Sequence, residues 1–365
     1  MTDARGPSMV EDQRFPCPSC GADLTFDPGS GDLVCGFCGH REATAGAAYA
    51  GPALREIDFA RAMADGLGGA DTAETRVSHC PNCGADITLS PQIHATVCPF
   101  CATPFVGDTG VERRIKPQGV LPFRVTEAEA RKALTDWLHG LWFAPNALRR
   151  FARKGRAMTG VYLPFWTFDA RTRARYRGAR GHVETRSYTD GEGRRRTRTV
   201  TSWFPASGEV SRVFDDILVS GSGTLPDADH AGLAPWDLAA LAPYSPSYIA
   251  GFQAEAYAVG PEPARDTAMA MMERAIHANI RRDIGGDRQR IDHVAFQARD
   301  VTFKHVLLPV WLAVYTFRGR MFRVALNGQT GRVTGERPYS WIKIGLAALL
   351  ALIVAGIAYY TGQQS

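Results

Sequence analysis

The sequence lacks the motifs that identify nucleotide-driven and hydrolytic enzymes. It has no G-x-x-x-x-G-K-[ST] phosphate-binding loop, no G-x-S-x-G nucleophile turn and no H-E-x-x-H zinc motif. Asp215 and Asp216 are adjacent in a strand-like run, where neighbouring side chains are expected to point to opposite faces. One histidine beside one aspartate, as in Asp292-His293, is commonplace in proteins. We therefore predict that the chain is not an enzyme, and that it is neither an ATPase nor a helicase.

Cysteine is missing beyond residue 101, and residues 1–15 contain no apolar segment of the kind that forms a secretory signal. The missing signal argues against an oxidising compartment, and therefore against a disulfide framework. The eight cysteines form four C-x-x-C pairs in two groups, which leaves no cysteine as a free nucleophile. The groups are Cys17, Cys20, Cys35 and Cys38, followed by Cys80, Cys83, Cys98 and Cys101.

The two cysteine groups are copies of one folded unit. Placing the first group on the second also superimposes two Gly-Ala-Asp tripeptides and places Phe37 on Phe100. Each group offers four sulfur ligands at the spacing of a zinc ribbon, so we predict two structural Zn²⁺ sites, with iron in a rubredoxin-like site as the alternative. Ribbons of about 25 residues bury too little apolar surface to fold without the metal. Four thiolates close each metal shell, so these sites are expected to hold structure and not to catalyse. The flanking histidines are expected at the surface: His40, His79 and His94.

Charge is absent from residues 344–360, the main part of the segment WIKIGLAALLALIVAGIAYY at 341–360. A helix of this length, at 1.5 Å per residue, spans about 30 Å, the thickness of the hydrocarbon core of a bilayer. Aromatic residues at both ends are typical of membrane interfaces. We predict one transmembrane helix at 341–360. The alternative is a buried core helix, although such a helix is usually shorter and carries a polar stripe.

The charges around this segment predict its orientation. Cations lie on its N-terminal side, whereas residues 361–365 have no charged side chain. The positive-inside rule therefore predicts a single-pass protein of the inner (cytoplasmic) membrane with its N-terminal bulk in the cytoplasm, where thiols stay reduced for metal. The cations are Arg332, Arg337 and Lys343. An alanine at every fourth position offers a face for a homo-oligomer, although alanine is common in such helices: Ala347, Ala351 and Ala355.

Between the ribbons and the apolar segment we predict an α+β body with antiparallel meanders. Thr126 and Glu129 form a capping box that predicts a helix ending at Gly140. A short helix is expected near Pro145 and a long one at 263–284. The expected order of units is zinc ribbon 1 at 14–41, a spacer at 42–77 with a helix near 53–67, zinc ribbon 2 at 78–106, the body at 115–338 and the transmembrane helix at 341–360.

The frame V-x-L-P-x-W occurs at 161–166 and again at 306–311. Each copy opens a run of alternating apolar and polar residues, so each is expected to begin the first strand of a meander. In the second meander Asn327-Gly328 is expected to form a hairpin turn. The recurrence predicts two related sheet units with helices packed against them, and core positions for Trp166 and Trp311.

Positive charge is concentrated at 171–198, which holds ten arginines and three acidic residues. The first four arginines alternate along the chain as on one face of a strand, and residues 189–193 are typical of a hairpin tip. Arginine forks match phosphate oxygens, so nucleic acid and anionic lipid near the anchor are both candidate ligands, and a solvated hairpin without a ligand is the third interpretation. The candidate residues are Arg171, Arg173, Arg175, Arg177, Arg194, Arg195, Arg196 and Arg198.

Several motifs occur together: doubled C-P-x-C-G-A-D ribbons, Leu121-Pro122-Phe123, W-F-A-P at 142–145, Y-L-P-F-W-T-F-D-A at 162–170 and the C-terminal apolar segment. In this combination the chain resembles a bacterial family of double zinc-ribbon membrane proteins, described as TFIIB-type or as primosomal protein N′ (replication factor Y) helicases. The resemblance covers nearly the whole chain. It implies a cytoplasmic, zinc-bearing, membrane-anchored protein without an established enzymatic activity. The helicase description is not carried over, because this chain lacks every ATPase motif.

The sequence therefore supports two hypotheses of function. The first is a membrane-anchored cytoplasmic scaffold or adaptor, without enzymatic activity, whose zinc ribbons bind an unidentified cytoplasmic protein. The alternative is a zinc-ribbon nucleic-acid-binding protein, related to the primosome or to transcription, that is tethered to the membrane. Binding that weakens steeply with salt would favour the alternative.

Overall fold

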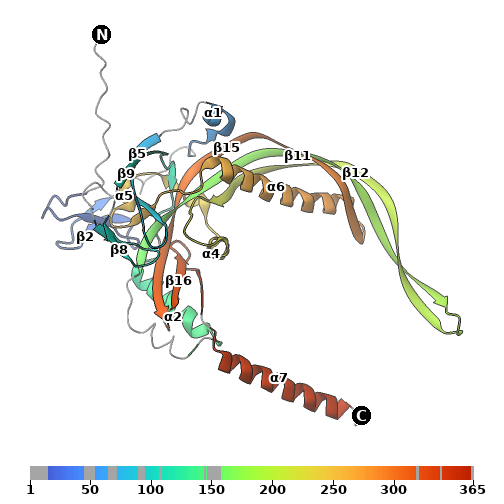
Figure 1. Cartoon of the computed structure of the whole chain (residues 1–365). Coiled ribbons are helices and arrows are strands. Elements are labelled where there is room, and N and C mark those ends of the chain that lie inside the picture. Colours follow the sequence, from blue (N-terminus) through green and yellow to red (C-terminus); the bar gives the residue numbers. More distant parts are fainter. Residues whose placement is uncertain are drawn as a thin grey trace.

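The computed structural model describes residues 15–44, 54–64, 72–88, 95–106, 109–143, 145, 158–317, 320–337 and 339–362. Within these residues the chain is a mixed α/β protein whose largest sheet has twelve strands. Figure 1 shows a body from which two elements project, a long arm of paired strands and the C-terminal helix.

The largest sheet is organised around two long antiparallel strands, β11 (Thr159–Thr189) and β15 (Arg288–Phe317). The two V-x-L-P-x-W segments lie opposite each other in this pair, with Leu163 facing Leu308. The first segment lies at the start of β11, as expected. The second lies in the middle of β15, so the prediction that it begins a strand is wrong. Residues before it extend β15 because their apolar side chains, including those of Val294 and Phe296, pack in the core of the arm.

The pairing of β12 (Arg195–Ser220) with β11 ends at a proline of β11. The last residue of β12 is Ser220, which pairs with Phe165. Pro164 is the residue before Phe165 in β11. Because proline has no N–H, it cannot donate the hydrogen bond that would extend the ladder with β12. Its carbonyl still accepts a 2.9 Å hydrogen bond from the N–H of Gly221. The ladder therefore ends at the proline.

The second segment repeats this arrangement with β16 (Arg320–Asn327). Asn327 is the last residue of β16 and pairs with Val310. Pro309 is the residue before Val310 in β15. Its carbonyl accepts a 2.8 Å hydrogen bond from the N–H of Gly328, the residue after Asn327. The chain then turns into β17 (Val333–Gly335), so Asn327-Gly328 lies in a turn as expected.

Two units with the same order of elements share the sheet. The first is β10 (Gly119–Val120), α2 (Glu127–Gly140), β11 and β12, and the second is β14 (Gln253–Glu255), α6 (Pro261–Ile284), β15 and β16. β10 runs parallel to β15, and β14 runs parallel to β11, so each unit adds its short strand to the long strand of the other. The prediction of two related units is therefore realised within one sheet, and not as two separate meanders.

The tryptophans of the two frames hold equivalent positions in these units. Trp166 is fully buried and Trp311 is 5 % exposed, which confirms their core roles. The indole N–H of Trp166 donates to the carbonyl of Val259, just before α6, at 2.8 Å. The indole N–H of Trp311 donates to the carbonyl of Val125, just before α2, also at 2.8 Å. Each tryptophan therefore fixes the start of a helix as well as filling the core.

The arm is a hairpin of β11 and β12, joined at 190–194, with β15 alongside its inner half. Its strands arch over α6, as Figure 1 shows. Buried positions alternate with exposed arginines along β11, because one face of the sheet packs on the helix. The core between them contains Ala174, Tyr176, Phe214, Met272, Ile276 and Ile280.

The two ribbons attach to the body differently. Ribbon 1 is a separate three-stranded sheet of β1 (Leu24–Phe26), β2 (Asp32–Cys35) and β3 (Arg41–Ala43). Ribbon 2 contains β6 (Asp86–Thr88), β7 (Ala95–Val97) and β8 (Pro104–Val106). β6 lies within the large sheet between β14 and β5 (Thr72–His79), and β5 pairs with β9 (Thr109–Ile115). A strand therefore begins inside the expected spacer at 42–77. The domain boundaries remain a prediction.

Most predicted helices are present. Thr126 and Glu129 form the expected capping box, and α6 begins close to the expected start. The spacer helix α1 (Phe59–Ala64) starts later than expected, because residues 54–56 are irregular and β4 (Ile57–Asp58) pairs with β15. Residue 53 and residues 65–67 lie outside the described residues. The helix expected after Pro145 also falls outside them. The sequence reading did not anticipate four short elements: α4 (Asp227–Leu233), η1 (Leu238–Ala240), β13 (Ala242–Pro243) and α5 (Pro246–Ile249).

The C-terminal helix, α7 (Trp341–Gly362), is long and apolar enough to cross a membrane. Its most apolar window has a mean hydropathy of 2.3 and none of it is buried against the protein. It is the one such helix in the described ranges. Figure 1 shows that it projects from the body beyond β16 and α2. The prediction of a single long apolar helix at this end is confirmed.

One carboxyl group is buried where the units meet. Glu255, at the end of β14, is 3 % exposed, and one of its oxygens accepts a 2.6 Å hydrogen bond from the hydroxyl of Thr224. Burial raises the pKa of Glu255 to about 7, although the hydroxyls of Thr224 and Ser222 act in the opposite direction. The raised pKa means that the folded protein holds this proton more tightly than the unfolded chain does.

The substitution Glu255→Gln is expected to change how stability depends on pH. The contribution of the Glu255 proton is fully present below the unfolded pKa of 4.5 and is lost as pH rises through about 7. The variant should therefore exceed the native chain by less than about 1 kcal/mol near pH 5 and by up to about 3 kcal/mol near pH 8. Thermal unfolding of the full chain in detergent between pH 5 and pH 8 measures this difference. Glu112→Gln, at a half-exposed carboxylate, is the control, and parallel pH profiles for Glu255→Gln and the native chain would contradict the expectation.

Candidate metal centres

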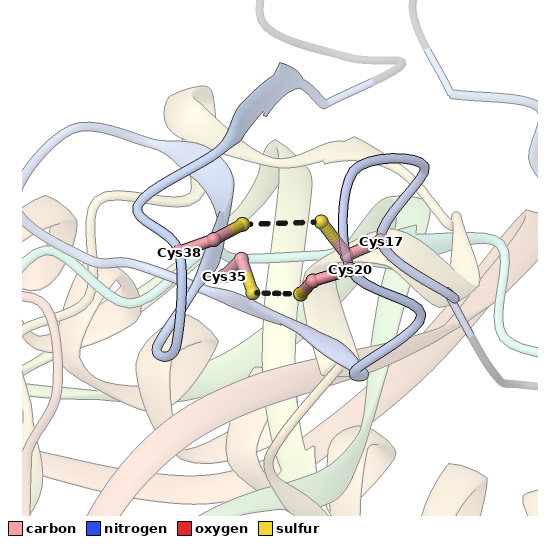
Figure 2. A group of neighbouring side chains, drawn as sticks. All are labelled: Cys17, Cys20, Cys35 and Cys38. Atoms are coloured by element: carbon pink, nitrogen blue, oxygen red, sulfur yellow. Dashed lines mark hydrogen bonds between the residues drawn. The ribbon is translucent and has the colours of Figure 1, made fainter.

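The first cysteine group forms a compact set of four sulfur atoms. Two C-x-x-C turns face each other, so that Cys17 lies opposite Cys38 and Cys20 opposite Cys35 (Figure 2). The sulfur atoms of these pairs are 3.6 and 3.5 Å apart, and all four lie within 4.8 Å of one another. A disulfide would need about 2.05 Å. Four sulfurs at about 2.3 Å from a central Zn²⁺ would be roughly 3.8 Å apart, so the spacing suits a tetrahedral metal site.

Each turn ends at a residue with positive φ. In ribbon 1 the first turn ends at Gly21 and the second at Gly39, and both glycines have a φ of 75°. The N–H of each glycine donates to the carbonyl of the first cysteine of its pair. Glycine is suited to this conformation because it has no Cβ. The backbone N–H groups of Cys38 and Phe37 point at the sulfur of Cys35 and lower the pKa of that thiol to about 6. These backbone N–H groups therefore favour the thiolate of Cys35, which is the form that binds metal.

The second group repeats this geometry inside the body. Cys80 is 3.6 Å from Cys101 and Cys83 is 3.6 Å from Cys98, sulfur to sulfur. Three of these four residues are buried, whereas Cys20 and Cys38 of ribbon 1 are exposed. The two Cys₄ groups can therefore hold two metal ions, consistent with zinc, in different surroundings.

The flanking histidines take no part in the sulfur clusters of the described residues. The side chain of His79 is 68 % exposed and lies 3.0 Å from a carboxylate oxygen of Asp86. His40 lies 3.3 Å from Glu42. His94 falls outside the described residues. The sequence expectation holds for the first two.

The arginine candidates lie on the arm, and the structure divides them into two sets. Arg171, Arg173, Arg175 and Arg177 are exposed on the face of β11 that points away from α6. Arg194, Arg195, Arg196 and Arg198 are exposed at and beside the tip. Acidic neighbours pair with part of each set: Glu209 contacts two arginines of the first, and Asp190 and Glu192 each contact one of the second.

A charged cluster at the base of the arm was missed by sequence reasoning. Asp215 and Asp216 were expected on opposite faces, but their carboxylates lie with that of Asp169 within 4.8 Å of one another, so this expectation is wrong. The pairing of β11 with β12 shifts register at Phe168, and Asp216 has a φ of 53°. A bulge of this kind breaks the alternation that the prediction assumed.

Lys304 supplies the positive charge of this cluster. Its ammonium nitrogen, on a side chain 8 % exposed, lies 2.8 Å from Asp216, 3.2 Å from Glu56 and 3.7 Å from Asp169. Burial opposes the charge on Lys304, but the hydrogen bond to Asp216 and the surrounding carboxylates raise its pKa above the ordinary value. An ammonium group already lies among these carboxylates and offsets part of their negative charge, so we interpret the cluster as a structural ion-pair network at the bulge and not as a metal site.

Comparison with known proteins adds a relative without an assigned activity. The chain is 27 % identical over 333 residues to a protein of Bacillus subtilis (strain 168) named "Uncharacterized protein YdjG", and the match covers 90 % of this chain and 91 % of that protein. No protein-family model matches. No solved structure matches.

Metal analysis of cysteine variants can test both centres. The purified full chain should contain two zinc ions, and Cys38→Ser and Cys101→Ser should each contain one, because each substitution removes one ligand from a closed shell. A chelator should remove the metal of ribbon 1 first, because two of its ligands are exposed. Elemental analysis measures the stoichiometry, with His79→Ala as a control that keeps both ions. Fewer than two metals in the native chain, or a loss of metal in the control, would contradict the assignment.

Proposed function

We propose that this chain is a membrane-anchored cytoplasmic scaffold or adaptor, without enzymatic activity, that presents ribbon 1 to a partner protein. Two structural Zn²⁺ ions hold the ribbons, and α7 anchors the chain in the inner membrane with its N-terminal bulk in the cytoplasm. The resemblance to TFIIB-type double zinc-ribbon membrane proteins supports the same assignment. Within this proposal the α+β body is the platform that carries the ribbon.

The observation that carries the proposal is the contrast between two equivalent phenylalanines. Phe100, on the second knuckle of ribbon 2, is fully buried in the apolar cluster that also contains Ile87 and Leu163. Phe37, at the same position in ribbon 1, is 88 % exposed. A large aromatic side chain on a turn fixed by metal is a suitable anchor for a protein interface, because little conformational entropy is lost when it is covered.

Ribbon 1 attaches to the body by its other side. Leu24, Phe26 and Leu33 pack with Phe123 and Tyr248 of the body. Rings of Phe26 and Tyr248 meet edge to face, with centroids 5.6 Å apart. The knuckle that carries Phe37 is therefore held firmly while it stays accessible. In Figure 1 the ribbon lies on the side of the body away from the arm.

The anchor can be tested by truncation and by fusion. A chain that ends at Ser340 should move from the membrane pellet to the soluble fraction, because it lacks the whole of α7. A fluorescent protein fused to residue 1 should fold in the cytoplasm, and alkaline phosphatase fused after residue 365 should be active outside it. Fractionation and the two reporter activities measure the result. A full-length chain in the soluble fraction, or the opposite pattern of reporters, would contradict the proposed anchor or its orientation.

The substitution Phe37→Asp tests the docking surface. An aromatic anchor at the centre of an interface contributes about 2 kcal/mol or more, so its loss should weaken partner binding roughly 30-fold. Affinity capture from cross-linked membranes, quantified by mass spectrometry, should show the partner depleted for Phe37→Asp. Val106→Asp, at a 76 % exposed position of ribbon 2, is the matched control and should leave capture unchanged. Equal capture by the native chain and Phe37→Asp, with both metals in place, would refute this role for ribbon 1.

A further inference from the structure

The arm carries a second surface that is separate from ribbon 1. In its three-stranded part, β11 lies between β12 and β15, and its buried side chains face α6. We call the opposite side of this sheet the arginine face. Its central column consists of Arg171, Arg173, Arg175 and Arg177, all of them exposed. Their neighbours across the two ladders are mostly small or uncharged, including Ser207, Ser211, Ala295 and Gln297.

The column is only partly neutralised. Glu209 contacts Arg173 and Arg175 together, and Arg171 lies 3.9 Å from Asp300. Arg177 makes no ion pair among the described residues, and its neighbour across the ladder is the exposed His293. Like charges at alternate strand positions repel one another, so a fold that needed only solubility would not benefit from this column. The excess charge points to an anionic ligand.

An aromatic side chain continues the arginine face toward the tip. Trp203 pairs with Gly181, which lies on the same side of β11 as the arginine column. Its side chain is 41 % exposed, and the guanidinium carbon of Arg290 lies 5.5 Å from the centre of its ring. An exposed indole beside arginines offers a stacking platform for a base, in the same way as in proteins that bind single-stranded nucleic acid.

The shape of the arm distinguishes between anionic ligands. The column follows one strand, so its arginines are about 7 Å apart and extend over about 20 Å. The strands arch over α6, which places the arginine face on the outer side of the arch (Figure 1). A flat bilayer can touch such an arch over only part of its length, whereas a flexible polyanion can follow the whole column. We propose that the arginine face binds single-stranded nucleic acid, with its phosphates on the arginine column and a base stacked on Trp203.

The test uses the full chain in nanodiscs of zwitterionic lipid and a fluorescent 20-nucleotide oligothymidylate, with binding measured by anisotropy at several salt concentrations. The variant Arg173→Gln/Arg175→Gln/Arg177→Gln should bind about tenfold or more weakly, and its salt slope should be shallower by about two, since each lost phosphate contact removes about 0.7. Trp203→Ala should weaken binding without changing the slope, because stacking releases no counterions. Arg274→Gln/Arg281→Gln/Arg282→Gln, on α6, removes the same charge from the other side of the arm and should bind like the native chain.

Chemical protection separates nucleic acid from lipid. Phenylglyoxal modifies exposed guanidinium groups, and the oligonucleotide should protect the arginine column from it in zwitterionic nanodiscs. Protection by nanodiscs containing phosphatidylserine, without protection by the oligonucleotide, would assign the surface to the membrane and overturn the proposal. Equal binding by the two triple variants would also overturn it. Both results are independent of Phe37, so failure here and failure of the adaptor role can be told apart.

Discussion

The antiparallel pairing of β11 with β15 is the constraint on which the rest of the structure depends. The two V-x-L-P-x-W frames meet there, and Leu163 facing Leu308 marks the centre of their pairing. Each proline ends the ladder of the next strand, because it has no N–H to offer. Each tryptophan holds the carbonyl that precedes a helix. Six residues, used twice, therefore determine where two strands end and where two helices begin.

The sequence was sufficient to predict the elements that depend on residues close together in the chain. The capping box at Thr126, the turn at Asn327-Gly328 and the apolar length of α7 each depend on neighbouring residues, and each could be predicted. The cysteine groups were equally clear, because ligand type and spacing define a sulfur tetrahedron. The pairing of the two V-x-L-P-x-W frames with each other could not be predicted in this way, since it joins residues far apart in the chain.

The ion-pair cluster at the base of the arm shows why part of the candidate chemistry was missed. Strict alternation along a strand would separate Asp215 from Asp216, and the bulge that removes the alternation has no signature in the sequence. Lys304 lies far from Asp216 in the chain and meets it only through the pairing of β11 with β12 and β15. Burial of the carboxyl group of Glu255 likewise depends on packing between the two units, which composition and periodicity do not report.

The duplicated ribbons show how one sequence unit can be placed in two different surroundings. Ribbon 2 contributes Phe100 to the core and a strand to the large sheet, so a metal held by its four cysteines would also support the body. At the end of its last turn it has Ala102 with a φ of 57°, where ribbon 1 has Gly39. Such a conformation is strained for alanine and persists only where the surrounding structure enforces it. Ribbon 1 packs through one side of its hairpin alone and keeps glycine in that turn. Its second knuckle therefore stays at the surface with Phe37 exposed, whereas the equivalent knuckle of ribbon 2 is buried with Phe100.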